Sequence, residues 1–340
     1  MEPARALRLI AFYLERAGEP TFKVRAFRKA AAITDELPEE ELAAHVRRGT
    51  LTRLSGIGNT TAAVISDAVH GREPAYLRKL ADDAKLPVAG GQELRAELRG
   101  DCHTHSDWSD GGSPIPEMAA AARELGHEWM VLTDHSPRLT VANGLSADRL
   151  RRQLDVVAEL NEEMAPFRVL TGIEVDILDG GALDQEEELL ARLDVVVASV
   201  HSKLRMPHAA MTRRMVRAVS NPHVDILGHC TGRLLTGNRK RPESTFDAKV
   251  VFEACRENGV AVEINSRPER LDPPRRLITL AMETGCVFSI DSDAHAPGQL
   301  DWLPHGCDRA EQCGVPSDRV INTRTADELL TWTDRSTETL

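Results

Sequence analysis

The segment GDCHTHSDWSDGGS, residues 100–113, places two histidines two positions apart among three aspartates. Imidazole nitrogens and carboxylate oxygens together are the ligands that Zn, Mn and Fe favour, whereas Mg and Ca prefer oxygen alone. A single segment of this kind is equally typical of a polar loop after a strand. The same residue types elsewhere in the chain therefore decide between a loop and a metal site.

Seven short apolar segments rich in β-branched residues carry histidines or carboxylates at or just beyond their C-terminal ends. The segments are 98–103, 129–135, 168–176, 193–201, 224–229, 260–265 and 286–295. The end residues that we assign as metal ligands are His103, His105, Asp110, His135, Glu174, His201, His229, Asp293 and His295. One histidine in such a place is ordinary, but its repetition at segment after segment predicts a metal centre.

The number and spacing of these residues predict what the centre binds. Residues two apart on a strand point the same way, so His103 and His105 face one side together. Cys102 then faces the other side, which in a barrel is the outer face. Nine ligands suit two or three divalent ions (Zn, Mn or Fe) with a bridging carboxylate. Such clusters activate water and neutralise phosphate oxygens.

Helical patterns separate the seven segments, at residues 114–126, 146–164, 208–219, 245–259 and 273–285. Strands that alternate with helices predict a parallel sheet, and segments that are apolar on both faces predict a buried one. A doubly wound open sheet and a barrel both fit this pattern. In a barrel the C-terminal strand ends share one face, so we expect an α/β domain over residues 99–335 with the ligands together.

The N-terminal part differs from this domain. Residues 1–85 follow a helical pattern with short breaks, and residues 86–98 are typical of a linker because they contain one proline and two glycines. The chain has a net charge of −11, but residues 1–95 carry +2 and the remainder −13. The slightly basic N-terminal part is the better candidate for contact with nucleic acid.

The composition sets limits on class and compartment. The 340 residues are 41% hydrophobic and 28% charged, which is enough apolar surface for a folded core. No apolar run approaches the ~18 residues of a membrane span, and the charged N-terminus is typical of a helix, not a signal peptide. The six cysteines form no CxxC pair, so we expect reduced thiols and a cytoplasmic protein without membrane contact. Nothing in these features indicates an oligomeric state.

The motifs HTH…SDG, LTDHS, GIEVD, SVHS, GHCTGR, EINSRPERLD and SDAH resemble those of the PHP (polymerase and histidinol phosphatase) superfamily over about residues 99–320. The stretches TDHSPRLTVANGLSADRL and GHCTGRLL are more similar to the PHP domain of bacterial family X DNA polymerases than to histidinol phosphatases. The resemblance implies a distorted (β/α)7 barrel, and so favours the barrel over the open sheet.

The resemblance also implies three metal positions that share the nine ligands. The first ion would be held by His103, His105, Glu174 and Asp293. Glu174 would bridge to a second ion held by His201 and His229. The third would be held by Asp110, His135 and His295, and Asp110 stands where some relatives have histidine.

Residues 1–85 resemble the polymerase β-like N-terminal domain of the same polymerases, with a helix-hairpin-helix at LSGIGNTTAAVI. This resemblance implies that Gly56 and Gly58 expose backbone N–H groups to a DNA phosphate at a helix start. The side chains that we assign to further phosphate contacts are Lys23, Arg25, Arg28 and Lys29. Animal relatives with lyase activity carry lysines where this chain has Thr60 and Val64, so we expect no lyase chemistry.

These features predict a metal-dependent phosphoester hydrolase that acts on DNA. The resemblance implies 3′-end processing or 3′–5′ exonuclease activity in DNA repair, without polymerase activity, because residues 86–98 leave no room for a polymerase core. A small-molecule phosphatase of the histidinol-phosphatase type and a non-catalytic DNA-binding protein are the alternatives.

Several further residues have predicted roles around the metals. Arg233 and Lys203, just past strand ends, are expected to clamp phosphate, and Arg267 is a weaker candidate. Asp134 is expected to orient a metal ligand or water. Trp108 is expected to form a wall of the substrate cleft.

Overall fold

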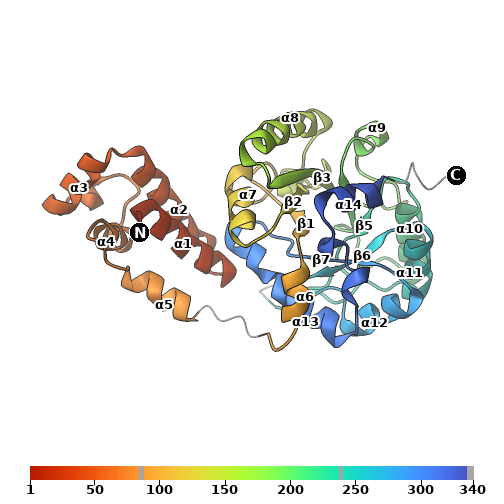
Figure 1. Cartoon of the computed structure of the whole chain (residues 1–340). Coiled ribbons are helices and arrows are strands. Elements are labelled where there is room, and N and C mark those ends of the chain that lie inside the picture. The colour runs from red at the N-terminus through yellow and green to blue at the C-terminus, as the bar shows by residue number, and fades with distance from the viewer. Residues whose placement is uncertain (84–87, 237–239, 335–340) are drawn as a thin grey trace. The chain divides into compact units, whose positions relative to one another are not determined.

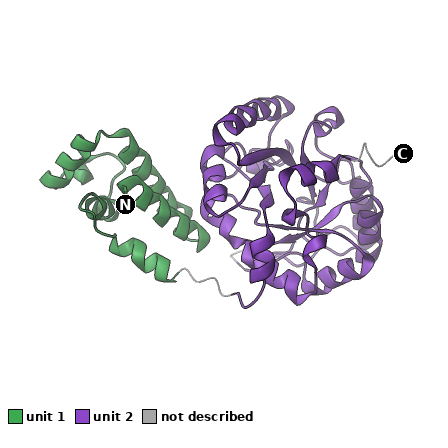
Figure 2. Cartoon of the chain, in the orientation of Figure 1, with its two compact units in different colours: residues 1–87 green, residues 88–340 purple. Residues whose placement is uncertain are grey.

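The computed structural model describes residues 1–83, 88–236 and 240–334. The chain divides into two compact units, residues 1–87 and 88–340 (Figure 2). Among the described residues, no helix combines the length and apolar character needed to cross a membrane.

The first unit is entirely helical in its described part, as predicted. Its helices are α1 (Pro3–Arg16), α2 (Thr21–Glu36), α3 (Glu39–Arg48), α4 (Asn59–Val69) and α5 (Ala75–Asp83). The apolar residues of α1 recur every three or four positions, and Leu7, Ile10 and Leu14 are almost fully buried as a result. They pack in one core with Phe27 of α2 and Ile65 of α4.

The second unit is built on seven parallel strands that pair in chain order (Figure 1). The strands are β1 (Gly100–Thr104), β2 (Trp129–Leu132), β3 (Arg168–Asp176), β4 (Val195–Ser199), β5 (Ile226–Leu227), β6 (Ala261–Asn265) and β7 (Phe288–Asp291). Thr104 and Ala294 form a parallel bridge, and the His105 N–H donates to the Ala294 carbonyl at 2.8 Å. The sheet therefore closes between β1 and β7, which confirms the barrel.

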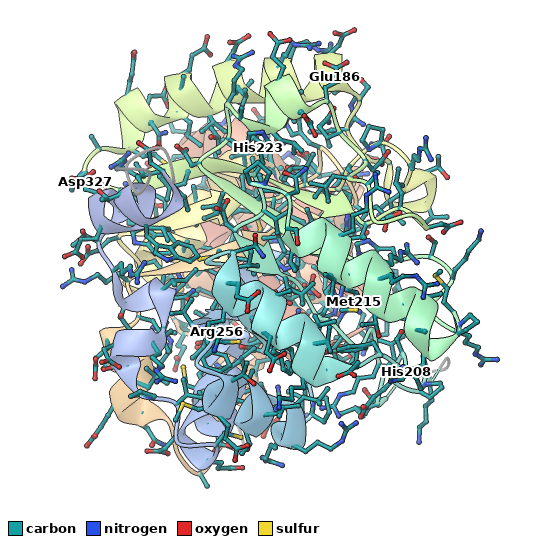
Figure 3. The ribbon with its side chains drawn as sticks, turned by 90° about the vertical axis from the view of Figure 1, so that its right-hand side faces the viewer. Glu186, His208, Met215, His223, Arg256 and Asp327 are labelled. Carbon is teal, nitrogen blue, oxygen red and sulfur yellow. The ribbon has the colours of Figure 1, made fainter. Side chains whose placement is uncertain are left out.

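Helices cover the barrel. They are α6 (Gln92–Glu97), α7 (Ile115–Glu124), α8 (Ala147–Met164), α9 (Glu187–Leu190), α10 (His208–Val219), α11 (Ala248–Glu257), α12 (Arg275–Thr284), α13 (Leu303–Gln312) and α14 (Ala326–Thr333). One of them, α14, packs Leu329 against the apolar residues of the barrel interior. Figure 3 shows α10 and α11 on the outside, where Met215 is buried while His208 and Arg256 are exposed. The five helices predicted between the strands all form, as α7, α8, α10, α11 and α12.

The barrel interior holds a small apolar cluster of its own. Alternate strand residues such as Val131, Val197 and Ala261 meet there, together with Leu329 of α14. Cys102 belongs to this interior cluster, so its prediction for the outer face is wrong. The reason is a register shift between Asp101 and Thr104, which breaks the strict alternation of side chains along β1.

The seam between β1 and β7 is held by buried polar groups. The Asp291 carboxylate accepts the Cys102 N–H at 2.9 Å and the Asn322 amide at 3.0 Å, and the same amide donates to the Gly100 carbonyl at 3.1 Å. Burial and the negative charge of Asp291 raise the pKa of Asp101 above its ordinary value. The seam is thus a fully enclosed polar network that joins the first strand to the last.

Part of the predicted linker is ordered against the barrel. Within residues 88–98, helix α6 packs on α13, and the Gly90 and Gly91 N–H groups donate to Asp308 (2.9 Å) and Glu311 (2.6 Å). A Cβ at Gly91 would lie 2.4 Å from the Asp308 nitrogen, and its φ is +80°. This segment therefore belongs structurally to the second unit.

We expect Gly91→Ala to lower the free energy of unfolding by roughly 2–4 kcal/mol, because it combines left-handed strain with a backbone clash. Gly126→Ala is the matched control, since its φ is +86° but nothing lies within 4 Å of its Cβ position. The control should cost only about 1–2 kcal/mol. Urea unfolding measures both, and equal losses would contradict the docking of this segment.

Candidate metal centre

Glu174 lies at the centre of the histidines predicted as ligands. Its carboxylate is 3.2 Å from His103 Nε2, 2.9 Å from His135 Nδ1 and 3.6 Å from His105 Nε2. On the other side it is 3.1 Å from His201 Nε2 and 2.9 Å from His229 Nε2. The C-terminal ends of β1, β2, β3, β4 and β5 thus supply one continuous set of ligand atoms. Glu174 itself is only 1% exposed.

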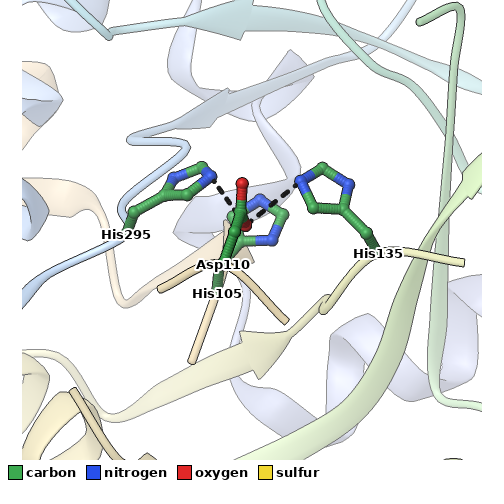
Figure 4. A group of neighbouring side chains, drawn as sticks. All are labelled: His105, Asp110, His135 and His295. Carbon is green, nitrogen blue, oxygen red and sulfur yellow. Dashed lines mark ion pairs between the residues drawn. The ribbon is translucent and has the colours of Figure 1, made fainter. Parts of the chain in front are cut away.

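A second group lies around Asp110 (Figure 4). The Asp110 carboxylate is 3.4 Å from His135 Nε2 and 3.3 Å from His295 Nε2. Asp293 connects this group to the first, at 3.5 Å from His105 Nε2 and 3.6 Å from His295 Nδ1. Asp110 is the most exposed member, with 37% of its side chain accessible, so it marks the solvent side of the centre.

Among the described residues, three sets of ligand atoms form, and the atoms of each set lie within 4.8 Å of one another. The sets are His105, Asp110, His135 and His295; His103, His105 and Glu174; and His135, Glu174 and His201. The first two overlap with the third and first metal positions implied by the family resemblance. The last pairs Glu174 with His201, as implied for the second position, and adds His135. His229 and Asp293 join through Glu174 and His105.

The donor atoms fit divalent cations. Buried side-chain atoms without a hydrogen-bond partner include His103 Nε2, both nitrogens of His105 and of His201, and Glu174 Oε2. Leaving such atoms unsatisfied costs about 1–3 kcal/mol each. Cations placed among them would satisfy these atoms with the nitrogen and carboxylate ligands that Zn, Mn or Fe prefer.

Burial and the close contact between Glu174 and the histidines also shift the pKa values of these groups. Burial alone would raise the pKa of Glu174, but the charges of His103, His201 and His135 hold it well below its ordinary value. Burial disfavours charge on His201, yet Glu174 raises its pKa to about 9. Metal binding to such a site displaces protons from the imidazoles.

Glu263 of β6 supports the ligands from behind. Its carboxylate accepts from His103 Nδ1 at 2.6 Å and from the His229 N–H, and it is fully buried. This contact leaves His103 Nε2 directed at Glu174. The ligand assignment did not include Glu263, although the polar end of β6 was the available signal.

Asp134 contacts the loop that carries the ligand candidate Asp110. Its carboxylate accepts from the Ser106 N–H (2.8 Å) and hydroxyl (2.6 Å), the Ser109 hydroxyl (2.5 Å) and the Gln153 amide (2.6 Å). The three bonds from Ser106 and Ser109 fix the loop that carries Asp110, and the fourth joins Asp134 to Gln153 of α8; none of them reaches a metal ligand. Asp134 therefore positions the loop.

A cleft of about 570 Å³ opens beside the centre. It is lined by Asp110, His135, His201, Asp293 and His295, and by Arg241, Arg267 and Arg270. Arg270 Nε lies 3.1 Å from Asp293, and Arg267 Nη1 lies 3.6 Å from it. The weaker candidate Arg267 is thus in the cleft, and the sequence pattern missed Arg241 and Arg270.

The two principal candidates for a phosphate clamp do not line the cleft. Arg233 donates to the backbone carbonyls of Arg270 and Leu271, so its guanidinium is occupied within the loop. Lys203 pairs with Asp179 at the surface, where 65% of its side chain is exposed. Trp108 packs against the core instead of forming a cleft wall. The direction in which each of these side chains points depends on loop conformation, which the spacing of residues in the sequence does not determine.

In the first unit, the predicted DNA contacts differ in availability. Lys23 pairs with Glu19 at 2.6 Å, and Arg28 pairs with Glu15 at 2.8 Å. Arg25 and Lys29 are exposed.

The hairpin presents its glycines to solvent. Gly56 and Gly58 are exposed on either side of the buried Ile57, and Gly56 has φ +101°. A Cβ at Gly56 would lie 2.6 Å from Lys29 Cε, so this amine-bearing chain borders the hairpin. Val64 is buried in the core of the unit and carries no amine.

Comparisons with known proteins agree with both units. Residues 101–267 match the PHP domain model, and residues 1–73 match a helix-hairpin-helix domain model. The chain is 39% identical over 240 residues to the DNA polymerase/3′-5′ exonuclease PolX of Bacillus subtilis, a match that covers 71% of this chain but 42% of that relative. It is 30% identical over 234 residues to a probable phosphatase of Thermoanaerobacter sp. (strain X514), covering 66% of this chain and 89% of the relative.

Among solved structures, a histidinol phosphate phosphatase from Lactococcus lactis, complexed with Zn, L-histidinol and phosphate, is 16% identical with a TM-score of 0.48. That similarity covers 64% of this chain and 95% of the other.

We expect Glu174→Gln to bind at least one divalent ion fewer per chain, because it removes the anion that five histidines share. Metal content measured by mass spectrometry after dialysis, with melting temperature alongside, checks this. His127→Gln is the control, because His127 is buried outside the centre and contacts Arg95. Unchanged metal content in Glu174→Gln would contradict the assignment.

Proposed function

The chain belongs to the PHP domain family, and from this premise we propose that it is a metal-dependent phosphoester hydrolase whose substrate is DNA. The observation that carries the proposal is the ligand cluster around Glu174, which borders a cleft that three arginines line. The same chain carries a helix-hairpin-helix domain. A hydrolytic centre and a module for nucleic-acid phosphates together favour DNA over a small substrate.

The residues of the cleft account for how a phosphoester would be held. Bound divalent ions would supply positive charge for the phosphate oxygens and make water a stronger nucleophile. Arg267 and Arg270 present guanidinium groups next to Asp293, within reach of a phosphate placed on the ligand cluster. Asp134 and Glu263 keep the ligand loops and imidazoles in place before substrate arrives.

The DNA reaction that we propose is removal of a 3′-terminal group or nucleotide, in repair. A relative whose printed name includes 3′–5′ exonuclease supports this class. We propose no polymerase activity, because residues 86–98 leave no room for a polymerase core between the two units, and no lyase activity, because Val64 lacks an amine. We further propose a cytoplasmic location.

The second candidate is a small-molecule phosphatase. A relative named as a probable phosphatase aligns over 89% of its length, and the same ligand cluster would serve a phosphomonoester. A DNA-binding protein without catalysis is the remaining alternative, which the hydrolysis assay below tests directly.

We expect the metal-loaded protein to cleave DNA 3′ ends faster than free phosphomonoesters. The panel comprises one duplex with a 3′-hydroxyl, a 3′-phosphate or a 3′-phosphoglycolate, together with histidinol phosphate and p-nitrophenyl phosphate. Glu174→Gln controls for contaminating nuclease. Turnover of free phosphomonoesters alone would favour the phosphatase, and no turnover of any substrate would favour the non-catalytic alternative.

We expect the double variant Arg25→Glu, Lys29→Glu to bind DNA about tenfold more weakly at 0.1 M salt and to show a smaller salt slope, because each lost phosphate contact reduces that slope by about one. Arg47→Glu, Arg48→Glu is the charge-matched control on α3, where both side chains are exposed. Titration by fluorescence anisotropy at several salt concentrations measures both. Equal weakening in the two double variants would remove the specific role of the hairpin.

A further inference from the structure

The cleft beside the metal centre is much larger than a phosphate group requires. Its volume of about 570 Å³ falls in the range of sites that enclose an organic ligand of drug size. A phosphate on the floor formed by Asp110, His135 and His295 would occupy a small part of it. The remaining walls therefore determine which organic group accompanies the phosphate.

One side of the cleft carries its three arginines, beside Leu234, Thr236 and Glu269. Arg241 lies in the segment between β5 and β6, and Arg267 and Arg270 lie in the segment that follows β6. Arg241 donates to the Gly232 carbonyl at 2.5 Å, and Glu269 lies 3.4 Å from Arg267, so this side is ordered and partly neutralised. Three guanidinium groups in one cleft disfavour a substrate whose organic part is itself a cation.

The opposite side is apolar. We name Leu139, Val141 and Ala142 the apolar wall; all three line the cleft and come from the segment after β2. In a closed ring of seven strands paired in chain order, β2 stands across the barrel from β5 and β6. The apolar wall therefore faces the side with the three arginines across the mouth of the barrel.

Val141 is unusual for an apolar side chain because it is 92% exposed. The segment that carries it is firmly held. The Ala142 N–H donates to the Leu139 carbonyl at 3.0 Å, and Asn143 Nδ2 donates to the Trp108 carbonyl at 3.2 Å. A Cβ at Gly144 would lie 1.8 Å from the Ser136 carbonyl oxygen, so the return of this segment requires glycine. The backbone thus holds the Val141 methyl groups in solvent at the cleft.

We propose that the apolar wall binds the base and sugar of the nucleoside joined to the reacting phosphate. This inference rests on the proposed DNA function and names the part of the substrate that the cleft selects. A nucleobase is uncharged and flat, and its faces gain from contact with aliphatic groups that would otherwise meet water. With cations held by the ligand cluster, the floor would complement a phosphate, and the apolar wall would complement a neutral organic group.

The test compares two oligonucleotides that differ only in the 3′-terminal residue, which carries a base in one and is an abasic tetrahydrofuran in the other. Val141→Ser should raise KM for the base-bearing end about fivefold with kcat unchanged, and leave KM for the abasic end unaltered. Val141→Ile should behave as wild type. Val250→Ser is the matched control, because Val250 is an exposed valine on α11, outside the cleft lining.

Equal effects of Val141→Ser on both oligonucleotides would overturn the inference, as would wild-type protein that does not distinguish them. If DNA is not cleaved at all, the proposed function fails separately. The comparison then uses a nucleoside monophosphate against deoxyribose phosphate. A preference for the base that disappears in Val141→Ser would support the apolar wall as a nucleoside site, and its persistence would overturn it.

Discussion

The buried carboxylate of Glu174 is the constraint around which the centre is organised. Five histidines lie within 3.6 Å of an anion that is 1% exposed. Burying a carboxylate costs several kcal/mol unless positive charge or donors surround it. Burial and the neighbouring charges of His295 and His135 lower the pKa of His105 well below its ordinary value, so this imidazole adds no positive charge and offers neutral nitrogens instead. Divalent cations would balance the same carboxylate and bind those nitrogens as well.

Closure of the barrel is what allows this arrangement. In an open sheet of the same strand order, β1 and β7 would lie at opposite edges, and His105 could not meet Asp293. The seam joins them through the His105–Ala294 backbone bond and the Asp291–Asn322 network. Asp293 also adopts φ +53°, a costly conformation for a residue other than glycine. That cost is retained where the carboxylate must turn toward the cleft, so the fold and the centre depend on the same few contacts.

The sequence predicted the strands and the converging polar ends because both are local signals repeated many times. Apolar β-branched runs specify strands, and parallel pairing brings their ends together whatever the loop details. The predictions that were wrong or incomplete all concern contacts that form only in the tertiary structure. The spacing of residues in the sequence does not predict the register shift that turned Cys102 inward. It also does not predict the carbonyl groups that accept hydrogen bonds from Arg233. Glu263 was visible at the end of β6, but its contact with His103 exists only once β1 and β6 share a barrel.

The ligand cluster around Glu174 and the cleft differ in their exposure to solvent. The atoms around Glu174 are enclosed, so ions held there would be shielded from solvent and bound strongly. Asp110 lies at the outer side, on a loop that three hydrogen bonds from Ser106 and Ser109 join to Asp134. Arg267 and Arg270 line the same cleft and lie next to Asp293. Charged residues form the floor and one wall of the cleft, and apolar residues form the opposite wall. A substrate that carries its charge at one end and an uncharged group at the other can satisfy both surfaces at once.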